Sequence, residues 1–335
     1  MQAQSVTSSD SVEIIDPTHN PYNIVFEGGG VLGVAYIGAI EELHIRGMFA
    51  NIKCFAGTSI GALTAMICAC KPSLPVLQQL LLSIDIHRML DVPCLLKAAY
   101  NIIAHKGVCP GAYALEWIRT TLLTLTGDPD ITLEQLEDKF DTKLTICVVN
   151  VTKRRLEYIT GKTHPTCSVA KLARAAMSIS ALYIPVDIFN NGDLYVDGGL
   201  LNNYPIQCFH YNTPTGDIIN PHTIGCMLFS DADAQVDFPP VGGLISYGMI
   251  HLNLLWNWPQ KQHLDEQDWQ RTIKIKTGQI SSLNFNITTE QVNELIARGR
   301  DAVTAWCEGK KVPIVSPCLT QHTPSDEQPR SILDL

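Results

Sequence analysis

A serine flanked by glycines stands where a predicted strand meets a predicted helix. The run from Gly57 to Gly61 (GTSIG) follows the apolar stretch Cys54–Ala56 and opens the apolar run Ala62–Ala69. A serine on such a sharp turn keeps its hydroxyl clear of the sheet, and the small neighbours avoid a collision across the turn. The helix N-terminus favours the negative charge that develops during acyl transfer. Ser59 is therefore a candidate nucleophile, and an inert serine cap is the alternative.

Three consecutive glycines form a second turn of this kind. Gly28, Gly29 and Gly30 follow a predicted strand and, with Gly33, open a helix. Without side chains to obstruct them, their amide groups can face an anion or an oxyanion. The spacing also fits a dinucleotide fingerprint, which expects an acidic residue about twenty positions further on. The stretch 48–53 (MFANIK) contains no acid, so a nucleotide site is disfavoured.

A carboxylate ends the predicted hairpin whose turn is Asn190-Asn191-Gly192. Asp197, followed by two glycines, can accept the serine proton as a general base. The alternative is a turn aspartate that bonds its own backbone. A Ser/His/Asp triad needs a histidine instead, and those after Asp197, none of which sits in a motif, are His210, His222, His251, His263 and His322.

The order of glycine cradle, serine turn and Asp-Gly-Gly resembles the patatin-like phospholipase family. The segment 174–186 (RAAMSISALYIPV) is similar to the block that precedes the aspartate in that family. The resemblance implies an α/β fold, a three-layer α/β/α sandwich with a mostly parallel central sheet. It also implies a lipid acyl hydrolase of the phospholipase A type, with Ser59 as nucleophile and Asp197 as proton acceptor. The implied oxyanion hole is formed by Gly28, Gly29 and Gly30, and the remaining motif glycines are Gly33, Gly57, Gly61, Gly198 and Gly199.

Two alternatives to phospholipid hydrolysis stay open. Leu32 stands where many family members carry Lys or Arg, so lipid esters without a phosphate are also candidate substrates. A catalytically weak lipid- or partner-binding module is the alternative from another functional class. Whether an activating protein partner is needed is equally open.

The elements that must position these residues follow from the apolar pattern. A predicted strand at Asn23–Phe26, a helix at Gly33–Arg46, a strand at Cys54–Ala56 and a helix at Ile60–Ala69 alternate. Such alternation predicts a mostly parallel sheet covered on both faces. Further strands are expected at Leu144–Val151, Val186–Phe189, Leu194–Val196, Thr223–Phe229 and Thr272–Lys276, and a last helix from Thr288 or Thr289 to Cys307.

Composition limits the class of protein. The 335 residues are 46% hydrophobic and 17% charged, so the chain can bury a full core. We expect one domain over residues 21–311, between flexible tails at 1–20 and 312–335. A net charge of −9 disfavours nucleic acid as a partner. Eleven cysteines without a Cys-x-x-Cys pair, and no signal-like start, predict buried thiols and a cytoplasmic protein.

Two further segments bear on membranes and metals. Phe238–Gln260 carries no formal charge; we expect a buried helix here, with peripheral membrane contact as the alternative and no transmembrane span. Asp231, Asp233 and Asp237 resemble part of a calcium loop, but Val236 and Gly242 occupy positions that an EF-hand reserves for Gly and Glu. We therefore expect no cofactor and calcium-independent activity on an acyl lipid.

Overall fold

The computed structural model describes residues 21–213, 216–230, 264–280, 282 and 287–309. Both expected tails, the segment Phe238–Gln260 and the aspartates at 231, 233 and 237 lie outside the described residues. Among the residues described, no helix is both long and apolar enough to cross a bilayer.

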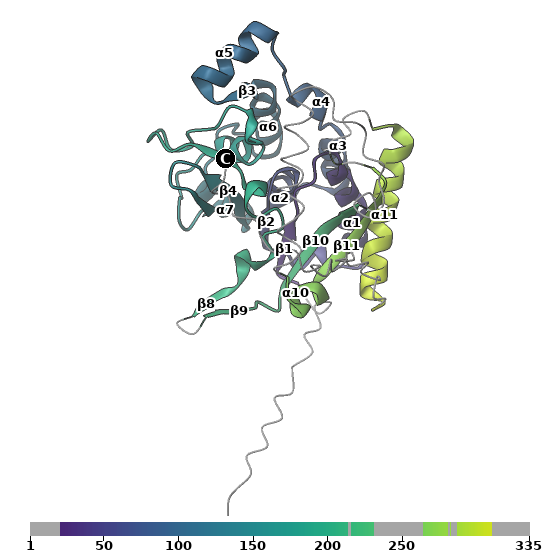
Figure 1. Cartoon of the computed structure of the whole chain (residues 1–335). Coiled ribbons are helices and arrows are strands. Elements are labelled where there is room, and N and C mark those ends of the chain that lie inside the picture. Colours follow the sequence, from purple (N-terminus) through teal and green to yellow (C-terminus); the bar gives the residue numbers. More distant parts are fainter. Residues whose placement is uncertain (1–20, 214–215, 231–263, 281, 283–286, 310–335) are drawn as a thin grey trace, which may run out of the picture.

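A seven-stranded sheet lies at the centre of the molecule (Figure 1). Its order is β11-β10-β1-β2-β4-β5, and β7 also pairs with β4. β5 and β7 run antiparallel to β4, whereas the other pairings are parallel. The strands are β1 (Asn23–Phe26), β2 (Cys54–Gly57), β4 (Lys143–Asn150), β5 (Arg155–Thr160), β7 (Tyr195–Asp197), β10 (Thr223–Ser230) and β11 (Thr272–Gly278). Two small sheets pair β3 (Gly107–Cys109) with β6 (Ala181–Tyr183) and β8 (Tyr211–Thr213) with β9 (Gly216–Ile218).

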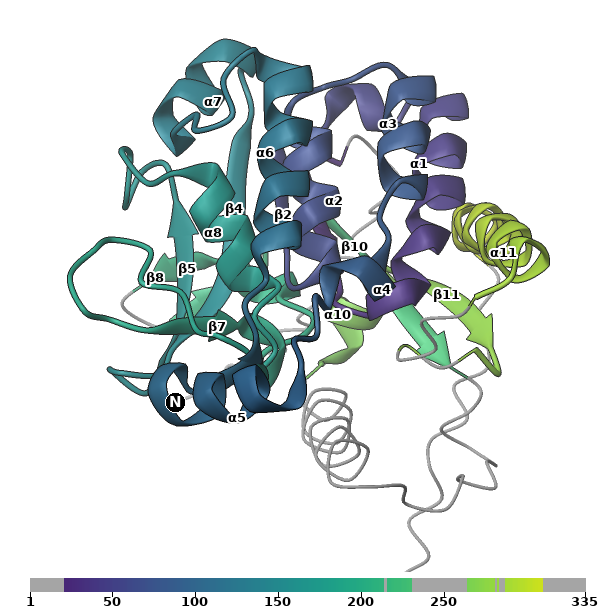
Figure 2. The same ribbon diagram turned by 90° about the horizontal axis from the view of Figure 1, so that it is seen from above.

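Helices complete the layers on either face of this sheet (Figure 2). The α-helices are α1 (Ala35–Ile45), α2 (Ile60–Ala69), α3 (Leu74–Leu82), α4 (Ile86–Met89), α5 (Leu95–His105), α6 (Ala112–Thr126), α7 (Leu133–Phe140), α8 (Val169–Ala176), α10 (Glu266–Gln270) and α11 (Thr289–Cys307). Short 3-10 helices are η1 (Gly30–Val34), η2 (Phe49–Asn51), η3 (Gly198–Leu200) and η4 (Ile206–Phe209).

The core lies on both faces of the sheet because neighbouring residues of a strand point to opposite sides. Ile24 and Phe26 of β1 join the large apolar cluster that includes α1 and α2. Val25 points the other way and joins a smaller cluster with Ile206 of η4, against which Trp269 of α10 packs. The strands of a sheet buried on both faces are almost wholly apolar, as β1 and β2 are. The chain is thus the three-layer α/β/α sandwich that the sequence predicted.

The predicted elements differ from the observed ones mainly around the hairpin before Asp197. Val186 forms only an isolated antiparallel bridge with Tyr195, so the predicted strand at Val186–Phe189 does not extend. The carboxylate of Asp187 accepts the amides of Asn191 and Gly192 and turns the chain away from the ladder. The prediction of a strand there was wrong, although the tight turn and its antiparallel return were right.

Candidate active site

Ser59 lies on a strained turn between β2 and α2. Its φ of 54° and ψ of −127° fall in a region that costs a non-glycine residue about 1–3 kcal/mol. The turn closes only with glycines on either side of the serine. A Cβ on Gly57 would lie 2.3 Å from the carbonyl carbon of Gly61, and one on Gly61 would lie 2.3 Å from the carbonyl oxygen of Phe26. Tight packing therefore holds Ser59 in the conformation of a nucleophile elbow.

The hydroxyl of Ser59 does not cap α2. Ser59 occupies the N-cap position, but its side chain accepts no hydrogen bond from the helix amides. The N-terminal end of α2 still directs its positive dipole toward the residue. The Ser59 hydroxyl is thus not engaged as a helix cap, and the alternative of an inert serine cap does not describe this turn.

The registers of three strands bring Asp197 to Ser59. β2 pairs with β4 as far as Gly57, which lies opposite Ile146. Further along β4, β7 pairs antiparallel, with Asp197 opposite Val148. β5 occupies the other edge of β4, so β2 and β7 must share one edge. The end of β7 therefore meets the end of β2, where the chain continues to Ser59.

Asp197 is a buried carboxylic acid with few partners. Only 1% of the residue is exposed. Oδ1 accepts the amide of Gly199 at 2.8 Å, and the amide of Asp197 donates to the Ser178 carbonyl at 2.9 Å. Loss of solvation raises the pKa of Asp197 to about 7, although the hydrogen bond from Gly199 and the nearby Ser59 hydroxyl both lower it.

The second carboxylate oxygen of Asp197 is available to Ser59. Among the residues described, buried Oδ2 has no hydrogen bond of ordinary geometry. The Ser59 hydroxyl is close enough to influence the Asp197 pKa but has not formed a full hydrogen bond. Such loose geometry is common in unliganded sites, where catalytic hydrogen bonds tighten when substrate binds. A carboxylate whose pKa lies near neutrality suits a general base.

The glycine cradle lies against the same serine. A Cβ on Gly28 would approach the Ser59 Cβ to 3.1 Å, and one on Gly33 would lie 2.5 Å from the Cγ1 of Ile60. Gly30 has a φ of +55°, and a Cβ there would lie 2.3 Å from the Ser282 carbonyl oxygen. The cradle and the serine turn thus form one site, which has no room for a side chain at Gly28, Gly30 or Gly33.

The three cradle amides are not equivalent. The Gly28 amide donates to the carbonyl of Asn203 at 2.9 Å, and the Asn203 side chain donates to the Gly28 carbonyl at 2.8 Å. The amides of Gly29 and Gly30, at the start of η1, have no partner among the described residues. Of the three amides predicted for the oxyanion hole, those of Gly29 and Gly30 are available as donors, whereas the Gly28 amide already holds the loop in place.

Two residues hold the candidate site in place that the sequence analysis did not single out, although Ser178 lies within the segment 174–186. Asn203 fixes the cradle, while the carbonyl of Ser178 fixes the backbone of Asp197. The side chain of Ser178 is in turn held by the buried Arg174 at 2.5 Å. The only sequence signal for Asn203 is the polar pair Asn202-Asn203 in an otherwise apolar stretch after the aspartate.

The two described histidines that follow Asp197 do not complete a triad. His222 immediately precedes β10, and its carbonyl accepts the amides of Tyr22 and Asn23 at the start of β1. His210 contacts Arg271, which precedes β11. Both histidines therefore lie near the N-terminal ends of the parallel strands. Ser59 follows the C-terminal end of β2, at the opposite end of these strands. The other three, His251, His263 and His322, lie outside the described residues.

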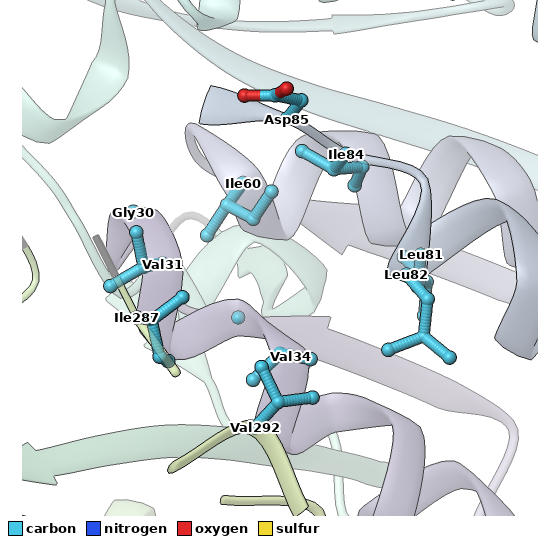
Figure 3. Close-up of a pocket in the computed structure, with 11 residues that line it drawn as sticks. Gly30, Val31, Val34, Ile60, Leu81, Leu82, Ile84, Asp85, Ile287 and Val292 are labelled. Atoms are coloured by element: carbon cyan, nitrogen blue, oxygen red, sulfur yellow. The ribbon is translucent and has the colours of Figure 1, made fainter. Parts of the chain in front are cut away.

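An apolar cavity of about 320 Å³ adjoins the cradle (Figure 3). Figure 3 shows Ile60, Val34 and Val292 around this space, with Leu81 and Leu82 at one side. Gly30 belongs to its wall, and Asp85 is the only charged residue among the described residues that line it. Within the described residues, no cluster of three or more His, Cys, Asp or Glu side chains could hold a metal ion.

Comparisons with known proteins agree with this geometry. The profile of the family described as Patatin-like phospholipase matches residues 24–210. An uncharacterised protein of Acanthamoeba polyphaga mimivirus is 27% identical over 84% of this chain and 92% of its own length. A probable lipid hydrolase of Invertebrate iridescent virus 6 is 23% identical over 58% of this chain and 69% of its own. In fold, the chain is similar to VipD from Legionella pneumophila, with a TM-score of 0.56, 18% identity and coverage of 87% of this chain and 67% of that one.

Proposed function

The chain belongs to the patatin-like phospholipase family, and we therefore propose that it cleaves fatty-acyl esters of glycerophospholipids as a phospholipase A. Family membership makes it a lipid hydrolase; the phospholipase A class and the Ser59–Asp197 dyad are the proposal. One observation carries it: buried Asp197, whose pKa is raised to about 7, adjoins the strained Ser59 beside two unpartnered amides.

The first half of the reaction transfers the acyl group to the enzyme. Asp197 takes the proton of the Ser59 hydroxyl as Oγ attacks the ester carbonyl carbon. The amides of Gly29 and Gly30 and the N-terminus of α2 stabilise the negative charge on the carbonyl oxygen. The tetrahedral intermediate collapses, the ester C–O bond breaks, and Asp197 gives its proton to the departing alkoxide, which leaves as the lysolipid hydroxyl.

The second half releases the fatty acid. A water molecule loses a proton to Asp197 as it attacks the acyl carbonyl of the Ser59 ester. The second tetrahedral intermediate collapses, and the Ser59 oxygen recovers its proton from Asp197. The residues themselves supply the nucleophile, the base and the oxyanion donors, so calcium-independent turnover is part of the proposal.

The adjoining cavity accounts for the acyl part of the substrate. Its side chains are aliphatic apart from Asp85 among the described residues, and Ile60 and Gly30 connect it to the serine turn and the cradle. Its volume of about 320 Å³ falls in the range of small-molecule sites, which are lined mainly by apolar groups. In the proposed reaction, the fatty-acyl chain occupies this cavity while its carbonyl carbon faces Ser59.

Substitution of both dyad residues tests this proposal. Ser59→Ala and Asp197→Asn should each reduce fatty-acid release from phosphatidylcholine vesicles about a thousandfold or more, because each removes a reacting group. Ser73→Ala and Asp138→Asn, at exposed positions away from the site, are the matched controls. A fluorophosphonate probe should label the parent protein and not Ser59→Ala. Full turnover by either dyad variant, or a rate that EGTA abolishes, would contradict the proposal.

Neutral lipid esters form a second candidate substrate class, because Leu32 supplies no cation beside the cradle. Leu32 is buried, and its side chain belongs to the main apolar cluster. The products released from phosphatidylcholine and from diacylglycerol, with Ser59→Ala as the blank, separate the two classes. Preferential cleavage of diacylglycerol would replace phospholipid with neutral lipid in the proposal.

A further inference from the structure

The helix α5 exposes its apolar side chains to solvent. Leu95, Leu96 and Ile103 are 88%, 86% and 85% exposed, and Ile102 and Tyr100 are also exposed. Leu95, Leu96 and Ile103 are more exposed than any other large apolar side chain in the described part of the chain. Amphipathic helices of a folded domain normally bury this face against the core. The orientation of α5 is the reverse of that pattern.

The polar side of α5 faces the protein. Asn101 is the one buried residue of the helix, and its side-chain amide donates to the carbonyl of Val108 at 2.9 Å. Leu95, Leu96, Ala99, Ile102 and Ile103 recur at spacings of three and four, so they share one face. The contact of Asn101 with the segment that contains Val108 thus holds this apolar face outward.

Two exposed cationic side chains belong to α5 and the residue that directly follows it. Lys97 and Lys106 are exposed, and no Asp or Glu occurs from residue 92 to residue 115. The carboxylate of the neighbouring Asp91 is directed toward α6, where it accepts the amides of Gly111 and Ala112. The segment is therefore locally positive, although the whole chain carries a net charge of −9.

The helix is attached to the elements that hold the catalytic carboxylate. β3 follows α5 directly and pairs with β6, with Gly107 opposite Ala181. Ala181 lies three residues after Ser178, whose carbonyl accepts the Asp197 amide. Figures 1 and 2 both show α5 at the periphery, outside the helices that cover the sheet. A partner surface that binds α5 would therefore contact a segment that is linked through β3 and β6 to the backbone of Asp197.

We propose that α5 is an interfacial helix that docks the enzyme on an anionic glycerophospholipid bilayer. Leu95, Leu96 and Ile103 enter the boundary between headgroups and acyl chains, while Lys97 and Lys106 contact lipid phosphates. Charge complementarity favours this surface over a second copy of the chain, because two α5 faces would place like charges together without acids to pair them. The inference rests on the proposed hydrolysis of membrane lipid.

Vesicle binding by inactive protein tests the docking without depending on turnover. In a Ser59→Ala background, sedimentation with vesicles of phosphatidylcholine and about one-fifth phosphatidylserine measures the dissociation constant. Adding L95S and I103S should weaken binding at least about tenfold, because two apolar side chains no longer enter the bilayer. The matched control, I45S with L123S, changes two exposed apolar side chains on α1 and α6 and should bind like the parent.

Two further variants test the chemistry of the contact. K97E with K106E should lower affinity for the phosphatidylserine vesicles much more than for phosphatidylcholine alone. Leu96→Trp should give a blue-shifted fluorescence emission when vesicles are added, because the indole leaves water.

Several outcomes would overturn the docking. They are equal binding by L95S/I103S and its control, an unshifted Leu96→Trp emission, or a loss of self-association in place of a loss of vesicle binding. The proposed function fails separately: vesicle binding without fatty-acid release by the parent enzyme would remove the hydrolysis and leave the docking in place.

Discussion

The role proposed for Asp197 comes with an energetic cost. Burial raises its pKa from 3.8 to about 7, so the ionised form that accepts a proton is unfavourable inside the protein. The strained backbone of Ser59 adds a second cost at the same place. Strained or desolvated groups of this kind tend to occur at functional sites, where the surrounding packing maintains them.

The pKa of Asp197 predicts how activity depends on pH. The carboxylate must be ionised to accept the Ser59 proton, so kcat/KM should rise about tenfold per pH unit below the pKa and level off above about pH 7. The measurement is the initial rate on a soluble p-nitrophenyl ester between pH 5 and pH 9, corrected for spontaneous hydrolysis at each pH. A flat profile below pH 7 would contradict Asp197 as the base.

The same pKa affects stability in the opposite direction. The folded state holds the Asp197 proton more tightly than the unfolded state, so the stabilisation is present below about pH 4 and lost as the pH rises through about 7. Asp197→Asn should therefore stabilise the protein by about 2–4 kcal/mol more at pH 8 than at pH 4. Thermal unfolding at both pH values measures the difference, and Asp138→Asn, at an exposed site, should show none.

At the scale of elements, the site is built where strands end and helices begin. β1 leads to the cradle, β2 leads to Ser59, and β7 ends in Asp197. Because β4 extends beyond β2, β7 can occupy the vacant part of the same edge. The positions of the proposed catalytic groups thus depend on the relative lengths and registers of strands, which fix them more firmly than a mobile loop could.

The cavity between η1, α2, α3 and α11 should select acyl chains by length. Val34→Phe adds a ring to its wall and should slow cleavage of a p-nitrophenyl palmitate about tenfold or more, while the butyrate ester is cleaved as before. Val151→Phe, at an exposed position beyond β4, is the matched control. Equal slowing of both esters by Val34→Phe would place the acyl chain elsewhere.

At the scale of the whole molecule, the fold depends on residues beyond the matched family region. That region ends at residue 210, yet β10 pairs with β1, and its Leu228 amide donates to Glu27 beside the cradle at 2.6 Å. α11 closes the structure against α1, where Gly38 and Gly299 let the two helix backbones approach closely. We propose that residues 21–311 fold as one domain.

The contact between α1 and α11 offers a test of the proposed single domain. A Cβ on Gly299 would lie 2.0 Å from the Ala35 carbonyl oxygen, so Gly299→Val must push the helices apart. It should lower the free energy of unfolding by about 2 kcal/mol or more, in a single transition that also removes activity. Ala297→Val, on the exposed side of α11, should have little effect. Two separate unfolding transitions would contradict the single domain.

The net charge of the whole chain and the local charge around α5 have opposite effects on membrane binding. The net charge of −9 opposes long-range attraction to anionic membranes, whereas the acid-free stretch around α5 provides a local cationic contact. Docking would then depend on the orientation of the enzyme, because α5 presents its apolar and cationic groups on one side of the molecule.

The sequence by itself determined the fold class, the family and the two turns that carry chemistry. β1 and α2 coincide with their predicted ranges, because continuous apolar runs next to glycine-rich turns leave few structural alternatives. Ser59 and its flanking glycines were identifiable because a sharp strand-to-helix turn admits only small residues. These features depend on local sterics and periodicity, which neighbouring residues express directly.

Tertiary structure alone decided which of those groups meet and what environment they meet in. The approach of Asp197 to Ser59 depends on the register of β7 on β4, and the engagement of the Gly28 amide depends on Asn203, 175 residues away in sequence. The raised pKa of Asp197 and the outward apolar face of α5 likewise depend on what surrounds each residue. Burial and long-range pairing result from the packing of the whole chain, and no local pattern encodes them.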